Sequence, residues 1–370
     1  MLSESSVETP AVQALRVLDV NPHTDRRWQA FVLNHPNGSI YHHPSWIRAL
    51  EEEYGQKAAH LACENERGEL VAILPLLYTR GMPLQFGGPL ASPRLSSLPR
   101  TPVAGPLSND FKATAALLRH AVELARRDPR MRLEIKTNSA EFDGVVPGLV
   151  QSRWRNVYVL ELPREAGTFG VPQVRRNIAK AARHGLQVRI ADTESDLRAW
   201  YRIYLATMRR NFVPARPYRF FASLQRSLCP RGMMELVLGE LVRGSKRTVV
   251  AGSIFFRFGQ TVSYAFGAMD RKYSSLCSND AIHWRAINQA CADGFRYFDF
   301  GEVPDGHTEL ARFKKKWGAQ PFPLFRYYCP ALPERVPSHH DSRQSLRRNL
   351  WRRLPLSLTA WIGDRIYSRL

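Results

Sequence analysis

The stretch GFRYFDFGEVPDGHTELARFKKKWGA, residues 294–319, combines a strand pattern with a basic helical segment. Because side chains of a strand point alternately to its two faces, FRYFDFG places Tyr297 and Asp299 on one face and Phe298 with Phe300 on the other. A glycine-containing turn follows, and then a segment with helical spacing. The stretch therefore predicts a strand with one aromatic and one polar face, followed by a helix.

Asp299 points either into a core or into a cleft, since it lies inside this strand. A buried carboxylate needs a partner, because moving an unpaired charge out of water is unfavourable. Arg296 and Arg312 are local candidates for an ion pair, and work as a general base is the alternative. The sequence leaves both interpretations open.

Outward from this stretch, helices and short strands alternate through both halves of the chain. RGELVAILPL (67–76) and SKRTVVAGSIFF (245–256) both place Val-Ala shortly after a charged turn, and each half later gives a helix, a tight turn and a basic strand. Two copies of one αββ…αβ unit fit this order better than a single large sheet. The predicted class is α+β, with domains at 1–160 and 161–330 and a tail at 331–370.

Composition and charge limit the classes of protein to consider. With 370 residues, 44% hydrophobic and 23% charged, the chain is long enough for two folded domains. The formal net charge of +20 attracts polyanions, which are nucleic acid, an anionic membrane face or a phosphate-bearing small molecule. The five cysteines form no CxxC pair or zinc-spaced cluster, so no metal is expected.

The opening MLSESSVETP has no basic or apolar segment typical of a secretory signal, and no apolar run of bilayer-spanning length occurs. A cytoplasmic protein is expected. Leucine and isoleucine recur every four residues near the C-terminus, among arginines, and this pattern predicts a basic amphipathic helical tail. The tail either contacts the inner membrane peripherally through 341–370 or packs on the protein's own surface.

Four motifs of the second half belong together, and they are RRNIAKAARHG (175–185), AFGAMDRKYSSLCSNDAIHWRAI (265–287), GFRYFDFGEV and ELARFKKKWGA. With these motifs the chain resembles the FemAB and BioF2-like acyltransferases. The resemblance implies two tandem GNAT-like domains, each a mixed, mostly antiparallel sheet flanked by helices. The C-terminal WRRLPLSLTAWIGDRI is similar to the tail of a subgroup found with exopolysaccharide and protein-sorting loci.

Within this resemblance, Phe313 and Lys314 match the family's Phe-Lys pair, and Trp317 follows at i+4 from Phe313. Acyl transfer to an amine passes through an oxyanion, which a fixed cation stabilises. Lys314 is therefore the leading catalytic candidate, and Phe313 is assigned to substrate binding. The alternatives are that Lys314 holds a phosphate of the donor or belongs to a solvated basic run.

Four further basic residues are assigned to substrate binding. Arg175, Arg176 and Lys180 match the basic helix that opens the family's second domain, where a helix N-terminus and cations make an anion site. Arg48 is the nearest match to a basic residue that meets the acceptor's phosphates. A surface helix with extra arginines is the alternative for the first three.

Three other residues complete the candidate site. Glu302, just past the strand, is placed to accept a proton from the attacking amine. Tyr264 and Tyr273 are candidates for hydroxyl hydrogen bonds to the substrate, although aromatic residues on a strand also serve as packing. Together with Asp299 and Lys314, Glu302 and Tyr264 form the predicted catalytic group.

The donor is inferred from a missing loop. Acetyl-CoA enzymes of this fold cradle the pyrophosphate on a glycine-rich loop that opens a helix, and DRKYSSLCSNDAIHW (270–284) has no glycine. No bound cofactor is expected, and the donor substrate is either aminoacyl-tRNA or acyl-CoA. The predicted function is transfer of an acyl or aminoacyl group to an amine on an envelope or exopolysaccharide precursor. The alternatives are a CoA-dependent N-acyltransferase acting on a small amine and a non-catalytic membrane-associated scaffold.

Overall fold

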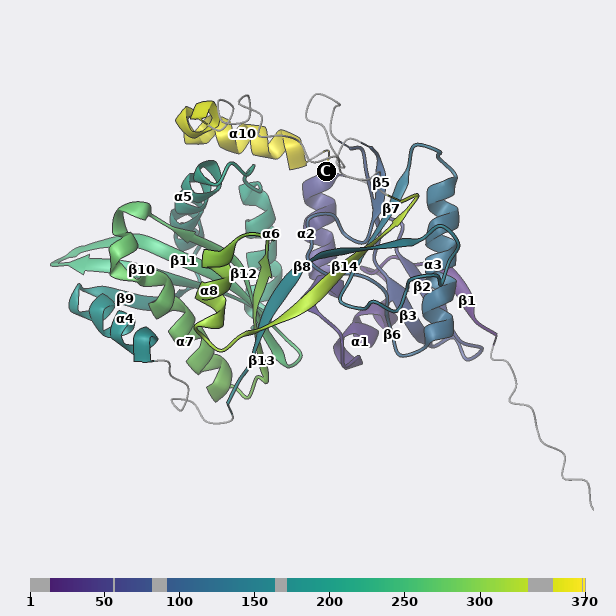
Figure 1. Ribbon diagram of the computed structural model, residues 1–370, viewed down its shortest axis with the longest axis horizontal. Coiled ribbons are helices and arrows are strands. Elements are labelled where there is room, and N and C mark those ends of the chain that lie inside the picture. Colours follow the sequence, from purple (N-terminus) through teal and green to yellow (C-terminus); the bar gives the residue numbers. More distant parts are fainter. Residues whose placement is uncertain are drawn as a thin grey trace, which may run out of the picture.

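A computed structural model describes residues 14–55, 57–81, 92–163, 172–331, 349–367 and 369. Much of the tail predicted at 331–370 lies outside the described residues, as does the start of the chain. The described part is a mixed α+β structure in which helices flank two sheets, as the sequence predicts (Figure 1). None of the described helices combines the length and apolar character needed to cross a bilayer.

The larger sheet has ten strands and runs through both halves of the chain. In spatial order its strands are β4 (Leu77–Thr79), β5 (Arg94–Ser96), β7 (Arg132–Thr137), β14 (Gln320–Cys329), β8 (Val150–Glu161), β13 (Tyr297–Val303), β12 (Thr261–Met269), β11 (Lys246–Phe258), β10 (Met234–Arg243) and β9 (Leu186–Ala191). The smaller sheet, of the first half, has the order β1 (Arg16–Asp19), β2 (Leu61–Glu64), β3 (Leu70–Leu74) and β6 (Leu107–Ser108).

Continuity of the large sheet differs from the two separate sheets that the sequence pattern favours. The late strand β14 returns to the first half and lies between β7 and β8, antiparallel to both. Pairing between β14 and β7 therefore joins strands almost 200 residues apart, which no local pattern reveals. The domain boundary at residue 160 stays a prediction, because one sheet contains strands from both halves.

Helices cover both faces of the sheets (Figure 1). Their bounds are α1 (Arg26–Asn34), α2 (Pro44–Tyr54), α3 (Phe111–Arg126), α4 (Pro172–Arg183), α5 (Glu194–Arg210), α6 (Tyr218–Leu228), α7 (Ser278–Ala292), α8 (Thr308–Lys315) and α10 (Leu356–Tyr367). Short 3-10 helices are η1 (Ile40–His42), η4 (Cys229–Arg231) and η5 (Arg271–Leu276). A further short helical segment covers 349–353.

Strand alternation separates the cores. On β10 and β11, Leu236 and Phe256 face α5 and α6, whereas Val237 and Phe255 face α7. Helix α2 of the first half joins the core of α5 and α6, so this hydrophobic cluster spans both halves of the chain. Burial of aromatic side chains such as Trp200, which is fully buried, makes this shared core a strong contribution to stability.

A buried ion pair also connects the two halves. Arg216, in the loop before α6, donates from one terminal nitrogen to Glu53 of α2 at 2.7 Å and from the other to the main-chain oxygen of Arg100 at 2.7 Å. The Arg216 guanidinium lies over the ring of Tyr367, at the end of α10. Helix α10, which lies in the predicted tail, thus packs on the body of the protein.

Candidate active site

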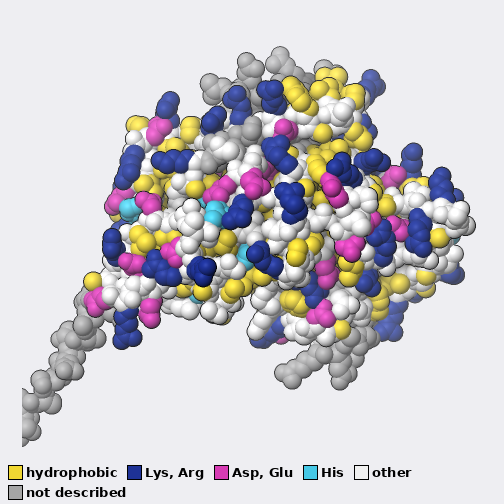
Figure 2. All heavy atoms as spheres, turned by 180° about the vertical axis from the view of Figure 1, so that it is seen from behind, with side chains coloured by type: hydrophobic (Ala, Val, Ile, Leu, Met, Phe, Trp, Pro, Cys, Tyr) yellow, Lys and Arg dark blue, Asp and Glu magenta, His cyan; other side chains and the backbone are white. Residues whose placement is uncertain are grey.

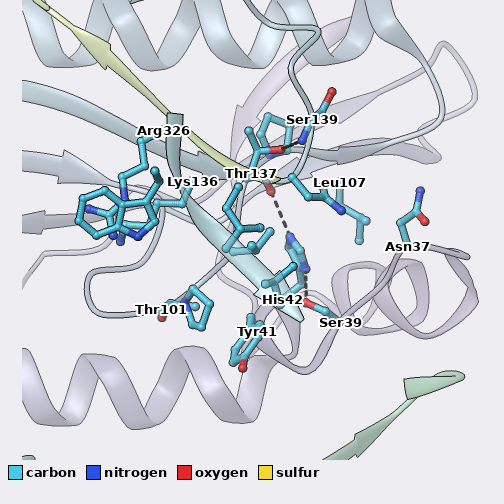
Figure 3. A pocket seen from close by; sticks show the side chains of 18 of the residues that line it. Asn37, Ser39, Tyr41, His42, Thr101, Leu107, Lys136, Thr137, Ser139 and Arg326 are labelled. Atoms are coloured by element: carbon cyan, nitrogen blue, oxygen red, sulfur yellow. Dashed lines mark hydrogen bonds between the residues drawn. The ribbon is translucent and has the colours of Figure 1, made fainter. Parts of the chain in front are cut away.

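A cavity with a volume of about 1940 Å³ lies over the middle of the large sheet. Its floor is one face of β7, β14, β8, β13 and β12, and residues 35–42 and 99–110 of the first half form much of the remaining wall (Figure 3). Pockets for small molecules usually measure roughly 300–1,000 Å³. The cavity is therefore large enough for an extended substrate.

The floor of the cavity contains a point where two neighbouring strands separate. Strands β12 and β13 run parallel, and Ser263 with Asp299 is the last of their three paired positions. Both strands then change register against their other neighbours, β12 after Tyr264 and β13 between Asp299 and Glu302. In the described part of the sheet, β12 and β13 are therefore no longer paired with each other beyond Ser263 and Asp299. The end of this pairing leaves an opening between the two strands.

Asp299 lies at this opening and lines the cavity. Its carboxylate accepts the main-chain N–H of Gly301 at 2.6 Å. Burial raises the pKa of Asp299 to about 6, although the Gly301 hydrogen bond and the charge of Lys314 oppose the shift. The expected alternation is confirmed, since Phe298 and Phe300 are fully buried on the opposite face.

The ion-pair interpretation of Asp299 finds no support among the described contacts, because Arg296 approaches Glu161 instead, at 3.6 Å. A carboxylate with a pKa near 6 is mostly ionised at neutral pH and still basic enough to accept a proton. The geometry therefore favours the alternative in which Asp299 is a general base.

Lys314 is buried behind the strand that carries Asp299. Its ammonium donates to the main-chain oxygens of Gly301 and Glu302, at 2.8 and 2.9 Å. Burial lowers the pKa of Lys314 to about 8, and the carboxylates of Asp299 and Glu302 oppose this shift. Lys314 is not among the described residues that line the cavity. The structure thus brings its charge to the back of the site rather than to the cavity surface.

The basic run at 314–316 is not a solvated stretch. Only Lys315 of the three is exposed. Lys316 forms an ion pair with Asp280 at 2.6 Å, and its ammonium lies 4.3 Å from the centre of the Phe313 ring. Phe313 packs in the core beside His283 and does not line the cavity among the described residues.

Glu302 lines the cavity and is held by two donors from β8. The indole N–H of Trp154 and the guanidinium of Arg155 donate to the same carboxylate oxygen, at 3.2 and 3.3 Å. The Trp154 ring is in turn covered by Arg155 and by Arg326, whose guanidinium carbons lie 4.5 and 3.4 Å from its centre. Contacts between cations and an aromatic face are favourable and hold the groups in one arrangement.

A charged cluster on β7 continues this network across β14. Glu134 accepts from Arg326 at 2.8 Å and lies 3.7 Å from Arg94. Burial pushes the pKa of Glu134 upward, but the charges of Lys136, Arg326 and Arg94 outweigh it and hold the pKa at about 2. Burial lowers the pKa of Lys136 to about 7, and its ammonium donates to the main-chain oxygen of Leu98 at 2.5 Å.

The cavity is consequently polarised. Cationic side chains gather on its floor and wall near β5, β7, β14 and β8, and they are Arg94, Arg132, Lys136, Arg153, Arg155 and Arg326. Of the six carboxylates that line the cavity, Asp299, Glu302 and Asp305 lie at the β13 end, Glu134 lies among the cations on β7, and Asp110 and Glu141 lie in other segments of the first half. An anionic group of a substrate fits the first end, and an amine or ammonium fits the second.

His42 is part of the wall on the side of the first half (Figure 3). Its Nδ1 lies 2.8 Å from the hydroxyl of Ser39 and its Nε2 3.0 Å from the main-chain oxygen of Gly105. Because a carbonyl only accepts, Nε2 carries the proton and Nδ1 accepts from Ser39. Burial lowers the pKa of His42 to about 4. His42 is therefore neutral and holds the wall, as a positioning residue.

Tyr264 lines the cavity beside Asp299, but its ring packs on the α7 side of the sheet. The ring centre lies 4.7 Å from that of His283, and the hydroxyl bonds to Ser253. Burial raises the pKa of Tyr264 to about 12. A Cβ added at Gly267 would lie 1.9 Å from the Tyr264 hydroxyl, so this glycine makes room for the ring. The packing alternative for Tyr264 thus agrees with the structure.

The other predicted substrate-binding residues lie away from the cavity. Arg48 is exposed on α2, and Tyr273 packs partly buried in η5. Arg175, Arg176 and Lys180 are exposed on α4, which packs against α7 on the other side of the sheet. None of these five is among the described residues that line the cavity. Nor do the described residues contain a group of three His, Cys, Asp or Glu side chains arranged to hold a metal ion.

The residues of the charged cluster are not among those that the sequence predicts for the site. Their signal is present in RLEIKT (132–137), where Glu134 and Lys136 share one face with Arg132, and Leu133 and Ile135 lie on the other. Charged residues in a buried strand need partners, and the partners Arg326 and Arg94 come from strands that only the sheet order brings together.

A domain-family model matches much of the second half of the chain. The matched part contains α7 and the strands β12 and β13, which separate at Asp299. Residues 172–315 match the model of the acetyltransferase (GNAT) domain family. This part of the chain is similar to GNAT acetyltransferase domains. The match confirms the predicted acyltransferase class for the domain that contains Asp299, Glu302 and Lys314. No curated protein sequence matches the chain.

Solved structures are similar to this protein over most of the chain. The structure of FemX is 16% identical, covers 91% of this chain and 100% of its own, and has a TM-score of 0.63. The C-terminal domain of a putative lysylphosphatidylglycerol synthetase from Agrobacterium fabrum is 12% identical, with coverages of 88% and 95% and a TM-score of 0.56. A tandem GNAT protein from the clavulanic acid pathway is 11% identical, with coverages of 87% and 100% and a TM-score of 0.51. The chain shares the fold of these proteins, one of which is described as a tandem GNAT protein.

Proposed function

We propose that the protein transfers an acyl or aminoacyl group to an amine on a large anionic acceptor, a precursor of the cell envelope or of an exopolysaccharide. The observation that carries the proposal is the position of Asp299, a carboxylate with a pKa of about 6 at the opening between β12 and β13. The opening lies in a cavity of about 1940 Å³ whose opposite end is cationic.

The chemistry requires a free amine and an enclosed site. Asp299 accepts a proton as the acceptor nitrogen forms a bond to the carbonyl carbon of the donor, and the bond from that carbon to the donor's oxygen or sulfur then breaks. The proton leaves with the released carrier. Lys314 supplies positive charge behind the strand and holds the two carbonyls of the bulge, so that Asp299 and Glu302 keep their direction.

The acceptor is inferred from the polarised lining. Phosphate or other acidic groups of a precursor pair with the cations around Lys136 and Arg326, while the amine lies near Asp299 and Glu302. A small amine alone leaves the cationic end unused. The net charge of +20 adds a general attraction for anionic substrates.

The donor is inferred from the start of α7. Asp280 lies in the first turn of this helix, buried and bonded to Lys316 and to the amide of Asn177. A helix N-terminus that already holds a carboxylate disfavours the pyrophosphate of a CoA donor at that place. Aminoacyl-tRNA is therefore the proposed donor. The acetyltransferase family match favours the second candidate, an acyl-CoA-dependent N-acyltransferase on a small amine.

The proposal is tested with purified protein, radiolabelled aminoacyl-tRNA and, in parallel, radiolabelled acetyl-CoA and longer acyl-CoA. A small-molecule extract of bacterial cells supplies the acceptor, and label in amide products is identified by mass spectrometry. We expect transfer from aminoacyl-tRNA, loss of transfer in Asp299→Asn, and retention in Asp19→Asn, an exposed carboxyl on β1 that does not line the cavity. Transfer from acyl-CoA alone establishes the second candidate, and equal rates in both variants overturn the role of Asp299.

A further inference from the structure

Helix α10 forms an outer layer of the molecule against α5 (Figure 1). Its inner face contains the buried residues Thr359, Gly363 and Tyr367. A Cβ added at Gly363 would lie 2.3 Å from the main-chain oxygen of Ala215, so the helix approaches the body closely at this glycine. Asp364 forms an ion pair with Arg219 of α6. These contacts attach α10 firmly through one face.

The outer face of the same helix is also apolar. Trp361 is 55% exposed and Leu358 is 39% exposed, and Leu350 in the preceding segment 349–353 is 66% exposed. In a helix residues 358 and 361 are neighbours on one side, away from 359, 363 and 367. A helix that packs through one apolar face usually presents polar residues on the other. The second apolar face of α10 therefore requires an explanation.

Positive charge surrounds this outer face. Arg352, Arg353 and Arg365 are exposed, and the Arg365 guanidinium lies 5.0 Å from the centre of the Trp361 ring. The acidic residue of α10, Asp364, is neutralised by Arg219. Figure 2 shows hydrophobic side chains at the top of the molecule, where α10 lies in Figure 1, with Lys and Arg side chains around them.

We propose that the outer face of α10 and of 349–353 binds an anionic phospholipid surface, with the helix parallel to the membrane plane. A tryptophan and leucines flanked by arginines fit a bilayer interface, where the apolar groups enter the acyl boundary and the guanidiniums meet lipid phosphates. The excess of basic residues favours a lipid surface over a second copy of this chain, because two such faces repel each other. The inference does not depend on the acyl donor or acceptor.

The test is flotation of the full-length protein with two kinds of vesicles, pure phosphatidylcholine and phosphatidylcholine mixed with phosphatidylglycerol. We expect binding to the mixed vesicles, weakened by high salt. The double variant Leu358→Ser, Trp361→Ser should lose about tenfold or more in vesicle affinity, because both side chains lose their apolar contribution. Leu33→Ser is the matched control, since Leu33 is 49% exposed on α1 in the other half.

Folding and self-association are monitored in the same samples. Thermal melting of the double variant should equal that of the wild type, because the inner face of α10 is unchanged, and acyl transfer in solution should be retained. Equal vesicle binding by wild type, double variant and control overturns the proposal. The proposal is also overturned if neither protein binds vesicles and light scattering shows a dimeric wild type and a monomeric double variant.

Discussion

The guanidinium of Arg326 lies 3.4 Å from the centre of the Trp154 ring, and the indole N–H of the same ring donates to Glu302. One side chain thus connects the cationic cluster on β7 and β14 with the carboxylates on β13. The binding end and the proposed reaction end of the cavity are therefore held in a common arrangement, across four neighbouring strands.

We expect Trp154→Phe to lower kcat/KM about tenfold, because Phe keeps a ring under Arg326 but loses the hydrogen bond to Glu302. Trp154→Leu should lower it further, since the cation–π contacts are lost as well. Steady-state kinetics measures both, with Trp361→Phe on the outer face of α10 as control. If Trp154→Leu retains wild-type kcat and KM, the network has no part in catalysis.

The pH dependence of Asp299 provides a second prediction. The transfer rate should rise with pH around 6, because the carboxylate acts as a base only when ionised. Asp299→Asn should lose about 10²-fold or more in kcat and should lose this limb of the profile. Initial rates between pH 5 and about 8 test the prediction. If Asp299→Asn shows the same pH–rate profile as the wild type, the ionisation belongs to another group.

The same variant should be more stable at neutral pH. The pKa of Asp299 is raised from 3.8 to about 6 in the folded state, so the folded protein binds this proton more tightly than the unfolded chain does. The stability that this binding contributes at low pH is therefore lost as the pH rises from 3.8 through 6. Asparagine has no charge to bury, and we expect up to about 2 kcal/mol of added stability above pH 6. Urea unfolding at pH 7.5 and at pH 4 measures this, with no gain expected at pH 4.

Removal of the Lys314 ammonium should affect both stability and turnover. Lys314→Ala leaves the carbonyls of Gly301 and Glu302 without this donor, and we expect a loss of about 1–3 kcal/mol in the free energy of unfolding. Turnover should decrease about 10²-fold, because the bulge that directs Asp299 loses its support. The neighbouring Lys315→Ala is the control, since Lys315 is exposed. Full stability in Lys314→Ala contradicts the observed hydrogen bonds.

The end of α10 should influence the cavity wall. Tyr367 is buried, and its hydroxyl accepts from Arg100 at 2.9 Å, a residue that lines the cavity. Deletion of 349–370 should lower the melting temperature by several degrees and raise KM for the acceptor, because the loop around Arg100 loses this contact. Tyr367→Phe should show a smaller effect on KM with α10 still attached. An unchanged melting temperature after deletion indicates that α10 is an appendage.

The sequence by itself determined the class of the fold and the alternation of the strand at 294–303. Asp299 and Phe298 were assigned to opposite faces from a period of two, and the structure confirms this assignment because side-chain direction in a strand is local. The motifs around Lys314 likewise predicted an acyltransferase of this fold, since most of their residues lie within the family match at 172–315.

Tertiary structure alone decided which residues share the site. Sheet order places β14 beside β7 and β8, and only this pairing brings Arg326 to Glu134 and Trp154. It also directs Lys314 to the back of β13 and leaves Arg175, Arg176 and Lys180 on an outer helix. The physical reason is that strand pairing between distant segments depends on the whole core, which is buried together, whereas residue patterns report only the local period.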